Sequence, residues 1–198
     1  MQIHFSKNDV NDKWGADFMG KEALIIVDMS NDFVAPDGSL TVGQPGQAIV
    51  PYIKSLAEDF VSQGKDVVVA MDAHQEDDPH FKLWPAHNVV GTEGQALYGE
   101  LQDWFQANQD NELVTYLPKE NYNSFFKTGL AELLLDKDVD TVHVVGVTTD
   151  ICVFNTVSGA DAYGFQTKVH ANGVATFTGL GDTMLEHMTR CFHTEIIK

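Results

Sequence analysis

Residues 22–28 read EALIIVD and residues 65–72 read KDVVVAMD. Both are short apolar runs rich in β-branched residues, which is typical of strands that are buried on both faces of a parallel sheet. Between them, apolar residues recur at helical spacing: Ile49, Ile53, Leu56, Phe60 and Val61. This part of the chain therefore predicts a strand–helix–strand unit with parallel strands.

The same alternation of apolar runs and amphipathic segments continues along the chain. It predicts further strands at residues 113–117, 141–147, 166–171 and 194–198, and helices at 97–105, 130–135, 152–163 and 183–192. Helices that alternate with parallel strands cover both faces of one sheet. We therefore expect an α/β fold with three layers, α/β/α, around a mostly parallel, Rossmann-like sheet of about six strands.

Length and composition favour one globular domain. The chain has 198 residues, 43% of them hydrophobic, which is enough for a sizeable core. Residues 21–198 carry the pattern of the domain, whereas residues 1–20 are polar and aperiodic and are interpreted as an N-terminal extension. The net charge of −17 disfavours nucleic acid and anionic membrane surfaces as partners. No apolar run is long enough for a bilayer span and the N-terminus lacks a signal pattern, so a cytoplasmic location is expected.

Chemically reactive side chains stand at the ends of four predicted strands. They are Asp28, Asp72, Lys119 and Cys152. Open parallel sheets bind ligands at the carboxyl ends of their strands. Each residue has an ordinary alternative role, as a helix cap, a solvated lysine or a core thiol. Their joint placement nevertheless predicts a catalytic site.

Cys152 is expected at the start of a helix, where the helix dipole and a nearby lysine would lower the pKa of its thiol. A carboxylate within reach could take the thiol proton and later return it to a leaving group. Cys191, inside the predicted helix 183–192, has no such setting and is expected to be structural. Cys152 is thus the candidate nucleophile.

The connection from residue 74 to residue 93 has neither helical nor strand periodicity, and it holds three histidines. Asp72 and His74 stand two positions apart at a strand end, a spacing that puts both side chains on one face. His80 and His87 follow in the same connection. Because imidazole and carboxylate ligands suit transition metals better than calcium, the set predicts a divalent metal site. The alternative is a loop with histidines and no metal.

Aromatic residues lie a few positions beyond three strand ends: Phe33, Trp84 and Tyr122. Such residues often only pack at the rim of a site. Around a pocket they would form flat apolar walls suited to a planar ring. Asp77 and Asp78 are expected to be solvated loop charges.

Four segments resemble one family, the isochorismatase-like cysteine hydrolases, and within it the nicotinamidases. They are LIIVDMSNDFVAPDGSL (24–40), MDAHQEDDPHFKLWPAH (71–87), PKENYNSF (118–125) and GVTTDICVFNT (146–156). The resemblance covers the chain from about Lys21 to its end. The sequence departs from the family at Ser30, where many members carry glutamine, so a hydrogen bond near Asp28 is in question.

The resemblance implies a catalytic triad of Asp28, Lys119 and Cys152. It also implies a cis peptide bond between Val147 and Thr148. The N–H groups of Thr148 and Cys152 would form the oxyanion hole.

The resemblance further implies one divalent transition metal, with zinc as the expected ion and iron or manganese as alternatives. Asp72, His74 and His87 match its ligands, and His80 matches a further ligand found in one branch of the family. The substrate ring would lie between Phe33 and Trp84, with Tyr122 nearby.

The activity that the resemblance implies is hydrolysis of the small molecule nicotinamide to nicotinate and ammonia, through a thioester, in NAD salvage. A homo-oligomer is also expected, since assemblies are usual in the family. The alternatives are an amidase of the same family acting on ureide or carbamoyl substrates, a noncatalytic module on the same fold, and a metal-hydroxide hydrolase in which Cys152 only packs. Isochorismatases themselves lack the metal site and do not use a cysteine.

Overall fold

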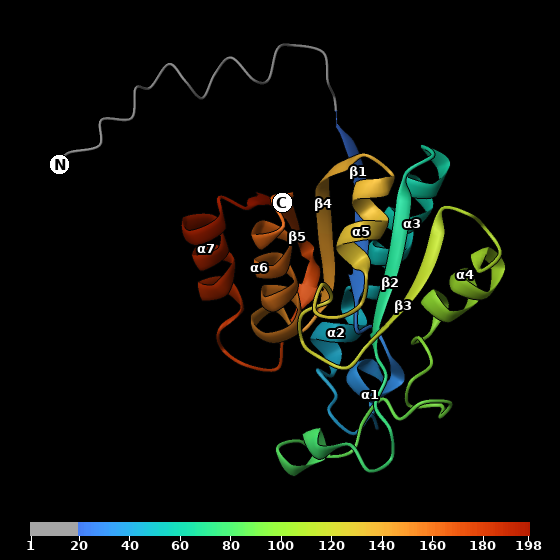
Figure 1. The fold of residues 1–198 in the computed structure, drawn as a ribbon. Coiled ribbons are helices and arrows are strands. Elements are labelled where there is room, and N and C mark those ends of the chain that lie inside the picture. Colours follow the sequence, from blue (N-terminus) through green and yellow to red (C-terminus); the bar gives the residue numbers. More distant parts are fainter. Residues whose placement is uncertain (1–19) are drawn as a thin grey trace.

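The computed structural model describes residues 20–198 (Figure 1). Within them, parallel strands form one sheet in the order β3-β2-β1-β4-β5-β6. The strands are Lys21–Val27 (β1), Asp66–Asp72 (β2), Val114–Lys119 (β3), Val139–Val147 (β4), Gln166–Ala175 (β5) and Glu195–Ile197 (β6). The predicted fold is confirmed, with a sheet of six strands that is entirely parallel. The predicted extension, residues 1–20, lies outside the described residues except for Gly20.

Helices cover both faces of the sheet; in Figure 1, α5 and α6 lie on the near face and α3 on the far face. The helices are Asn31–Val34 (α1), Gln44–Ala48 (α2), Val50–Ser62 (α3), Glu100–Asn108 (α4), Leu130–Asp136 (α5), Phe154–Ala162 (α6) and Gly181–Phe192 (α7). A 3₁₀ turn, Pro79–Lys82 (η1), and a π-helical turn, Thr149–Val153 (η2), complete the described chain. The sequence did not predict α1, α2 and η1, because four or five residues carry too little periodicity to be recognised. No helix in the described part of the chain is both long and apolar enough to span a bilayer.

The central strand β1 separates two hydrophobic cores. Ala23, Ile25 and Val27 pack on the face covered by α5, α6 and α7, whereas Leu24 and Ile26 pack on the face covered by α3 and α4. All five side chains are at most 1% exposed. Burial on both faces explains why β1 reads as an unbroken apolar run instead of an alternating one.

Strand β5 is longer than the sequence predicted, because it continues to Ala175 instead of ending near Ala171. The pair Asn172–Gly173 is typical of a turn, but in the structure both residues lie within strand β5. The pairing of β4 with β5 shifts register between Val144 and Gly146, which accommodates the irregularity. As a consequence, residues 176–180 emerge at the carboxyl edge of the sheet, where Thr176 and Thr178 are bonded to Asp150 in the turn that follows β4.

Candidate active site

Asp28 lies directly after β1, in the left-handed region with φ of 55°. Its carboxylate is completely buried and both oxygens are bonded. Oδ1 accepts from the backbone N–H of Asp72 at 2.8 Å, and Oδ2 accepts from Nζ of Lys119 at 2.7 Å. Burial, and then the nearby charge of Asp72, raise the pKa of Asp28 to about 6 against the opposing pull of Lys119. This carboxylate is therefore fixed in place and poised to exchange a proton near neutral pH.

Lys119 joins the two acidic residues. The register of β2 and β3 places it opposite Asp72, and its Nζ also bonds an oxygen of Asp72. Burial by itself disfavours the charged amine, but Asp28 and Asp72 raise the Lys119 pKa above its ordinary range. Burial also opposes ionisation of Asp72, yet the charge of Lys119 holds the pKa of Asp72 at about 2. The lysine is thus a permanent cation between two buried carboxyl groups.

Cys152 lies in η2, ahead of α6, and is 6% exposed. Its Sγ is within 4.8 Å of carboxylate oxygens of Asp28 and Asp72. Burial, and then the charge of Asp28, raise the pKa of this thiol well above its ordinary value. The expected net lowering of the thiol pKa is therefore wrong: the charge of Lys119 does act to lower this pKa, but burial and the charge of Asp28 outweigh it. The resting thiol keeps its proton and needs a base to remove it.

The turn at the end of β4 brings Thr148 and Cys152 to the same pocket. The Val147–Thr148 peptide bond is cis, as the family resemblance implied. The carbonyl of Thr148 accepts from the N–H groups of Ile151 and Val153, at 3.2 and 3.1 Å. The chain thereby folds back so that Thr148 and Cys152 both line the pocket.

The structure brings the three loop histidines together. An isolated bridge pairs His74 with Val89, and the N–H of His74 donates to the carbonyl of Asn88 at 3.0 Å, so the loop returns and places His87 beside His74. The ring of His80 stacks on that of His74, with centroids 4.8 Å apart. One nitrogen from each of the three rings lies within 4.8 Å of the others.

These side chains fit a divalent metal. Nε2 of His74 is buried and has no hydrogen-bond partner within residues 20–198, whereas its Nδ1 is bonded to Asp78 at 2.9 Å. His87 likewise uses Nδ1 on the carbonyl of Pro85, at 2.7 Å. The Nε2 atoms of His74 and His87 lie 3.7 and 3.8 Å from Oδ2 of Asp72. In metal sites, one ring nitrogen of a histidine faces the metal, and the other ring nitrogen forms a hydrogen bond that orients the ring.

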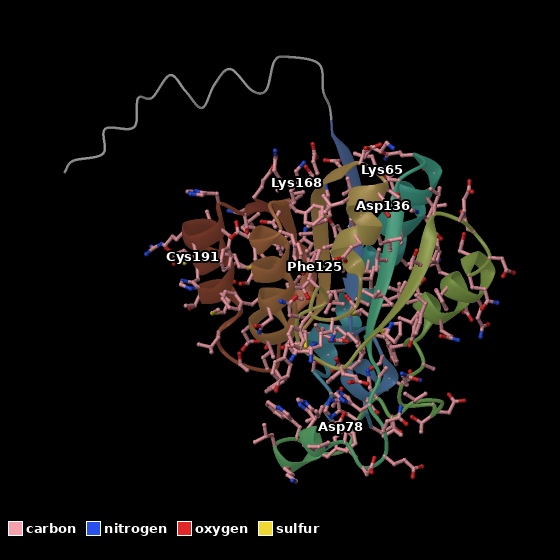
Figure 2. The ribbon with its side chains drawn as sticks, viewed as in Figure 1. Lys65, Asp78, Phe125, Asp136, Lys168 and Cys191 are labelled. Atoms are coloured by element: carbon pink, nitrogen blue, oxygen red, sulfur yellow. The ribbon has the colours of Figure 1, made fainter. Side chains whose placement is uncertain are left out.

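Asp78 is not the solvated charge that the sequence predicted. Besides bonding the ring of His74, it accepts from the N–H of His80 at 2.8 Å and so caps η1. Figure 2 labels Asp78 within the loop that projects beyond the carboxyl edge of the sheet. Because Pro79 follows Asp78, the pair forms a helix-start signal that could have identified this role.

A pocket that is partly open to solvent is lined by Cys152. Its walls include these predicted residues: Phe33, Asp72, His80, Trp84, His87, Tyr122, Thr148 and Cys152. Nε1 of Trp84 donates to the hydroxyl of Tyr122 at 2.9 Å, which fixes both rings. Asp28, Lys119 and His74 are not among the wall residues; they lie buried behind the pocket.

Several residues of the site were missed by sequence reasoning. Leu40, Ile151 and Phe177 also line the pocket, as does Val147 at the end of β4. Asn88 is fully buried and accepts from the Ser30 hydroxyl at 2.7 Å, so Ser30 is bonded to the loop that carries His74, His80 and His87. Apolar residues on loops, such as Leu40, follow no periodic pattern that sequence analysis could recognise. Phe177 follows the end of β5 and could have been recognised from that position, but the sequence predicted that this strand ends earlier.

Sequence comparison identifies the family. The chain matches the isochorismatase domain over residues 22–196. It belongs to the isochorismatase family. One relative in this family, an uncharacterized isochorismatase family protein PncA of Bacillus subtilis (strain 168), is 42% identical over 164 residues, covering 81% of this chain and 90% of the relative.

Solved structures of the isochorismatase fold agree. The crystal structure of nicotinamidase/pyrazinamidase PncA from Bacillus subtilis matches with a TM-score of 0.88 and 37% identity, covering 90% of this chain and all of that one (100%). Pyrazinamidase of Pyrococcus horikoshii, solved in complex with zinc, matches with a TM-score of 0.80 and 29% identity over 90% of this chain and 99% of that chain.

Proposed function

We propose that this isochorismatase-family protein hydrolyses nicotinamide to nicotinate and ammonia, with Cys152 as the nucleophile. The observation that carries the proposal is the placement of a buried thiol beside the fixed carboxylate of Asp28, at the base of an aromatic-walled pocket. Relatives named nicotinamidase or pyrazinamidase support the same substrate class. The reaction would serve NAD salvage.

In the proposed reaction Asp28 takes the proton of Cys152, and the sulfur attacks the amide carbon. The N–H groups of Thr148 and Cys152 stabilise the negative charge that develops on the carbonyl oxygen. Asp28 returns its proton to the nitrogen as the C–N bond breaks, so ammonia leaves and an acyl thioester remains. Asp28 then takes a proton from water, whose oxygen attacks the thioester carbon and displaces the sulfur. Asp28 returns that proton to the sulfur of Cys152, and the nicotinic acid that is released ionises to nicotinate. Lys119 keeps Asp28 oriented throughout.

Asp72, His74, His80 and His87 would hold the metal, and their nitrogen and oxygen ligands suit zinc, iron and manganese alike. Zinc is proposed first because the similar pyrazinamidase of Pyrococcus horikoshii was solved in complex with zinc. The metal, when bound, would supply a Lewis acid for the pyridine nitrogen of the substrate. Phe33 and Trp84 would then flank the ring, and Tyr122 would hold Trp84 through the hydrogen bond described above. A homo-oligomer and a cytoplasmic location stay predictions from the sequence.

The direct test is ammonia release from nicotinamide by purified protein, before and after chelation and with metal added back. We expect release that chelation abolishes and that zinc, iron or manganese restores. If the metal-loaded protein released no ammonia from nicotinamide but did so from a carbamoyl or ureide amide, the substrate assignment would be wrong and the family's amidase chemistry would stand.

The hydrogen bond from His74 to Asp78 gives a prediction for the metal site. Asp78→Asn removes the negative charge behind His74 but keeps an oxygen that can cap η1, so metal affinity should fall about 10-fold. Competition with a chromophoric chelator measures the affinity. The matched control is Asp77→Asn, which changes an exposed neighbour and should leave affinity unchanged. Equal affinities in the two variants would show that Asp78 does not orient a metal ligand.

A further inference from the structure

Phe177 is an exposed aromatic side chain at the mouth of the pocket. It lies on the loop between β5 and α7, and 51% of its surface is exposed, yet it forms part of the pocket wall. The wall residues His80, Trp84 and His87 come from the loop after β2, and Tyr122 follows β3. Phe177 therefore belongs to a separate segment of the chain. An exposed large apolar side chain beside a pocket is a common feature of ligand contacts.

The loop that carries Phe177 is bonded to the turn that carries Cys152. Both carboxylate oxygens of Asp150 accept hydrogen bonds, one from the hydroxyl of Thr176 and one from the hydroxyl of Thr178, each at 2.7 Å. The Thr176 hydroxyl in turn accepts from the N–H of Thr178 at 3.1 Å. Phe177 is thus held on both sides by residues that share one anchor, two positions before the nucleophile.

Other apolar residues of the pocket wall indicate which kind of ligand surface Phe177 would contact. Leu40 and Ile151 also line the pocket, and neither offers a polar side chain to a ligand. An apolar rim of this kind favours the unsubstituted edge of a planar ring and disfavours a polar or bulky substituent there. It also restricts the access of water to the ring once the substrate is bound.

We propose that Phe177 is a specificity-determining residue that closes the solvent side of the pocket over the ring of an aromatic amide, and that Asp150 positions it through Thr176 and Thr178. The statement that an aromatic ring occupies the pocket rests on the proposed function. The closure itself concerns access to Cys152 and can be tested without that substrate.

The kinetic test compares Phe177→Ala with wild type on nicotinamide and on a nicotinamide that carries a bulky ring substituent. We expect KM for nicotinamide to rise about 10-fold while kcat stays within about threefold. The ratio of kcat/KM for the substituted amide to kcat/KM for nicotinamide should rise about 10-fold. Phe126→Ala is the matched control, because Phe126 is 50% exposed but lines a different cavity. It should leave all three quantities unchanged.

The positioning role of Asp150 is tested by removing the two hydroxyl groups that donate hydrogen bonds to its carboxylate. The double variant Thr176→Val with Thr178→Val removes both donors and leaves η2 itself unaltered. It should change KM and the substrate ratio in the same direction as Phe177→Ala and leave kcat close to that of wild type. A double variant that kept wild-type KM and selectivity would exclude Asp150 as the positioning residue.

An alkylation test separates this inference from the proposed function. Full-length metal-loaded protein is treated with iodoacetamide or with the larger N-phenylmaleimide, and mass spectrometry follows Cys152 relative to exposed Cys191, which Figure 2 shows on α7 at the periphery of the molecule. In Phe177→Ala we expect the relative labelling of Cys152 by the larger reagent to rise about fivefold or more, and labelling by iodoacetamide to change less.

The outcomes are distinct. If wild type releases ammonia from nicotinamide but Phe177→Ala alters neither KM, selectivity nor labelling, the inference is overturned and the proposed function stands. If wild type does not act on nicotinamide but Phe177→Ala still opens Cys152 to the larger reagent, closure of the pocket by Phe177 is supported and the proposed substrate is wrong.

Discussion

Replacing Cys152 with alanine should abolish ammonia release, with a loss on the order of 10⁴-fold or more in kcat/KM. The reason is that the variant lacks the sulfur that attacks the amide carbon and forms the thioester. The proposed metal ligands do not include Cys152, and metal content should therefore equal that of wild type. Elemental analysis and the ammonia assay, run on the same preparation, measure both quantities.

Cys191→Ala is the matched control for this variant. Cys191 was expected to be structural, but it is exposed on α7, where its sulfur lies 3.5 Å from Nε2 of His187. It is remote from the pocket wall, so its removal should leave kcat/KM unchanged. Substantial activity in Cys152→Ala would instead favour the metal-hydroxide alternative, in which the thiol only packs.

Much of the site was predictable from the sequence because a parallel sheet delivers the ends of its strands to one edge. Asp28 and Asp72 end neighbouring strands, and Lys119 ends the strand beside β2, so a rule about strand ends brings all three together without any knowledge of side-chain contacts. The two-residue spacing of Asp72 and His74 likewise predicted that both side chains would lie on one face, and Nε2 of His74 lies 3.7 Å from Oδ2 of Asp72.

Features that depend on tertiary packing were not predictable in this way. The raised pKa of the Cys152 thiol arises from burial beside Asp28, and sequence position reveals neither the depth nor the separation of the two groups. Phe177 was missed because Asn172 and Gly173 are typical of a turn, and only the irregular pairing with β4 keeps them within β5. The hydrogen bond between Asp78 and His74 depends on the path of the loop that follows β2, which the bridge between His74 and Val89 holds in place.

Replacing Lys119 with methionine should cost both stability and activity. Its amine is buried between Asp28 and Asp72, and methionine has a similar length but no charge. Two buried carboxylates would then face each other without a cation, which we expect to lower the free energy of unfolding by about 3–5 kcal/mol at neutral pH. Activity should fall by about 10²-fold or more, because Asp28 loses the contact that orients it.

The control for Lys119 is Lys137→Met. Lys137 also pairs with a carboxylate, that of Asp66 at the start of β2, but its side chain is 32% exposed. Partly exposed pairs contribute little, so this variant should lose no more than about 1 kcal/mol in the free energy of unfolding. Urea unfolding of both variants, with the ammonia assay, separates the loss of a buried charge from the loss of a lysine in general.

The pH dependence distinguishes this explanation from simple loss of packing. In wild type, Lys119 holds the pKa of Asp72 at about 2, below the ordinary value of 3.8, so the pair contributes stability that is present above pH 3.8 and is lost as the pH falls through 2. In Lys119→Met that contribution is absent, and the pKa values of Asp28 and Asp72 rise because the opposing cation has gone. The folded variant must then bind a proton at these carboxyl groups, and this uptake costs more free energy at pH 7 than at pH 5. The stability deficit of the variant should therefore be largest near pH 7 and should shrink as the pH falls toward 5. A deficit that stayed constant over this range would show that lost packing, and not the uncompensated carboxylates, destabilises the variant.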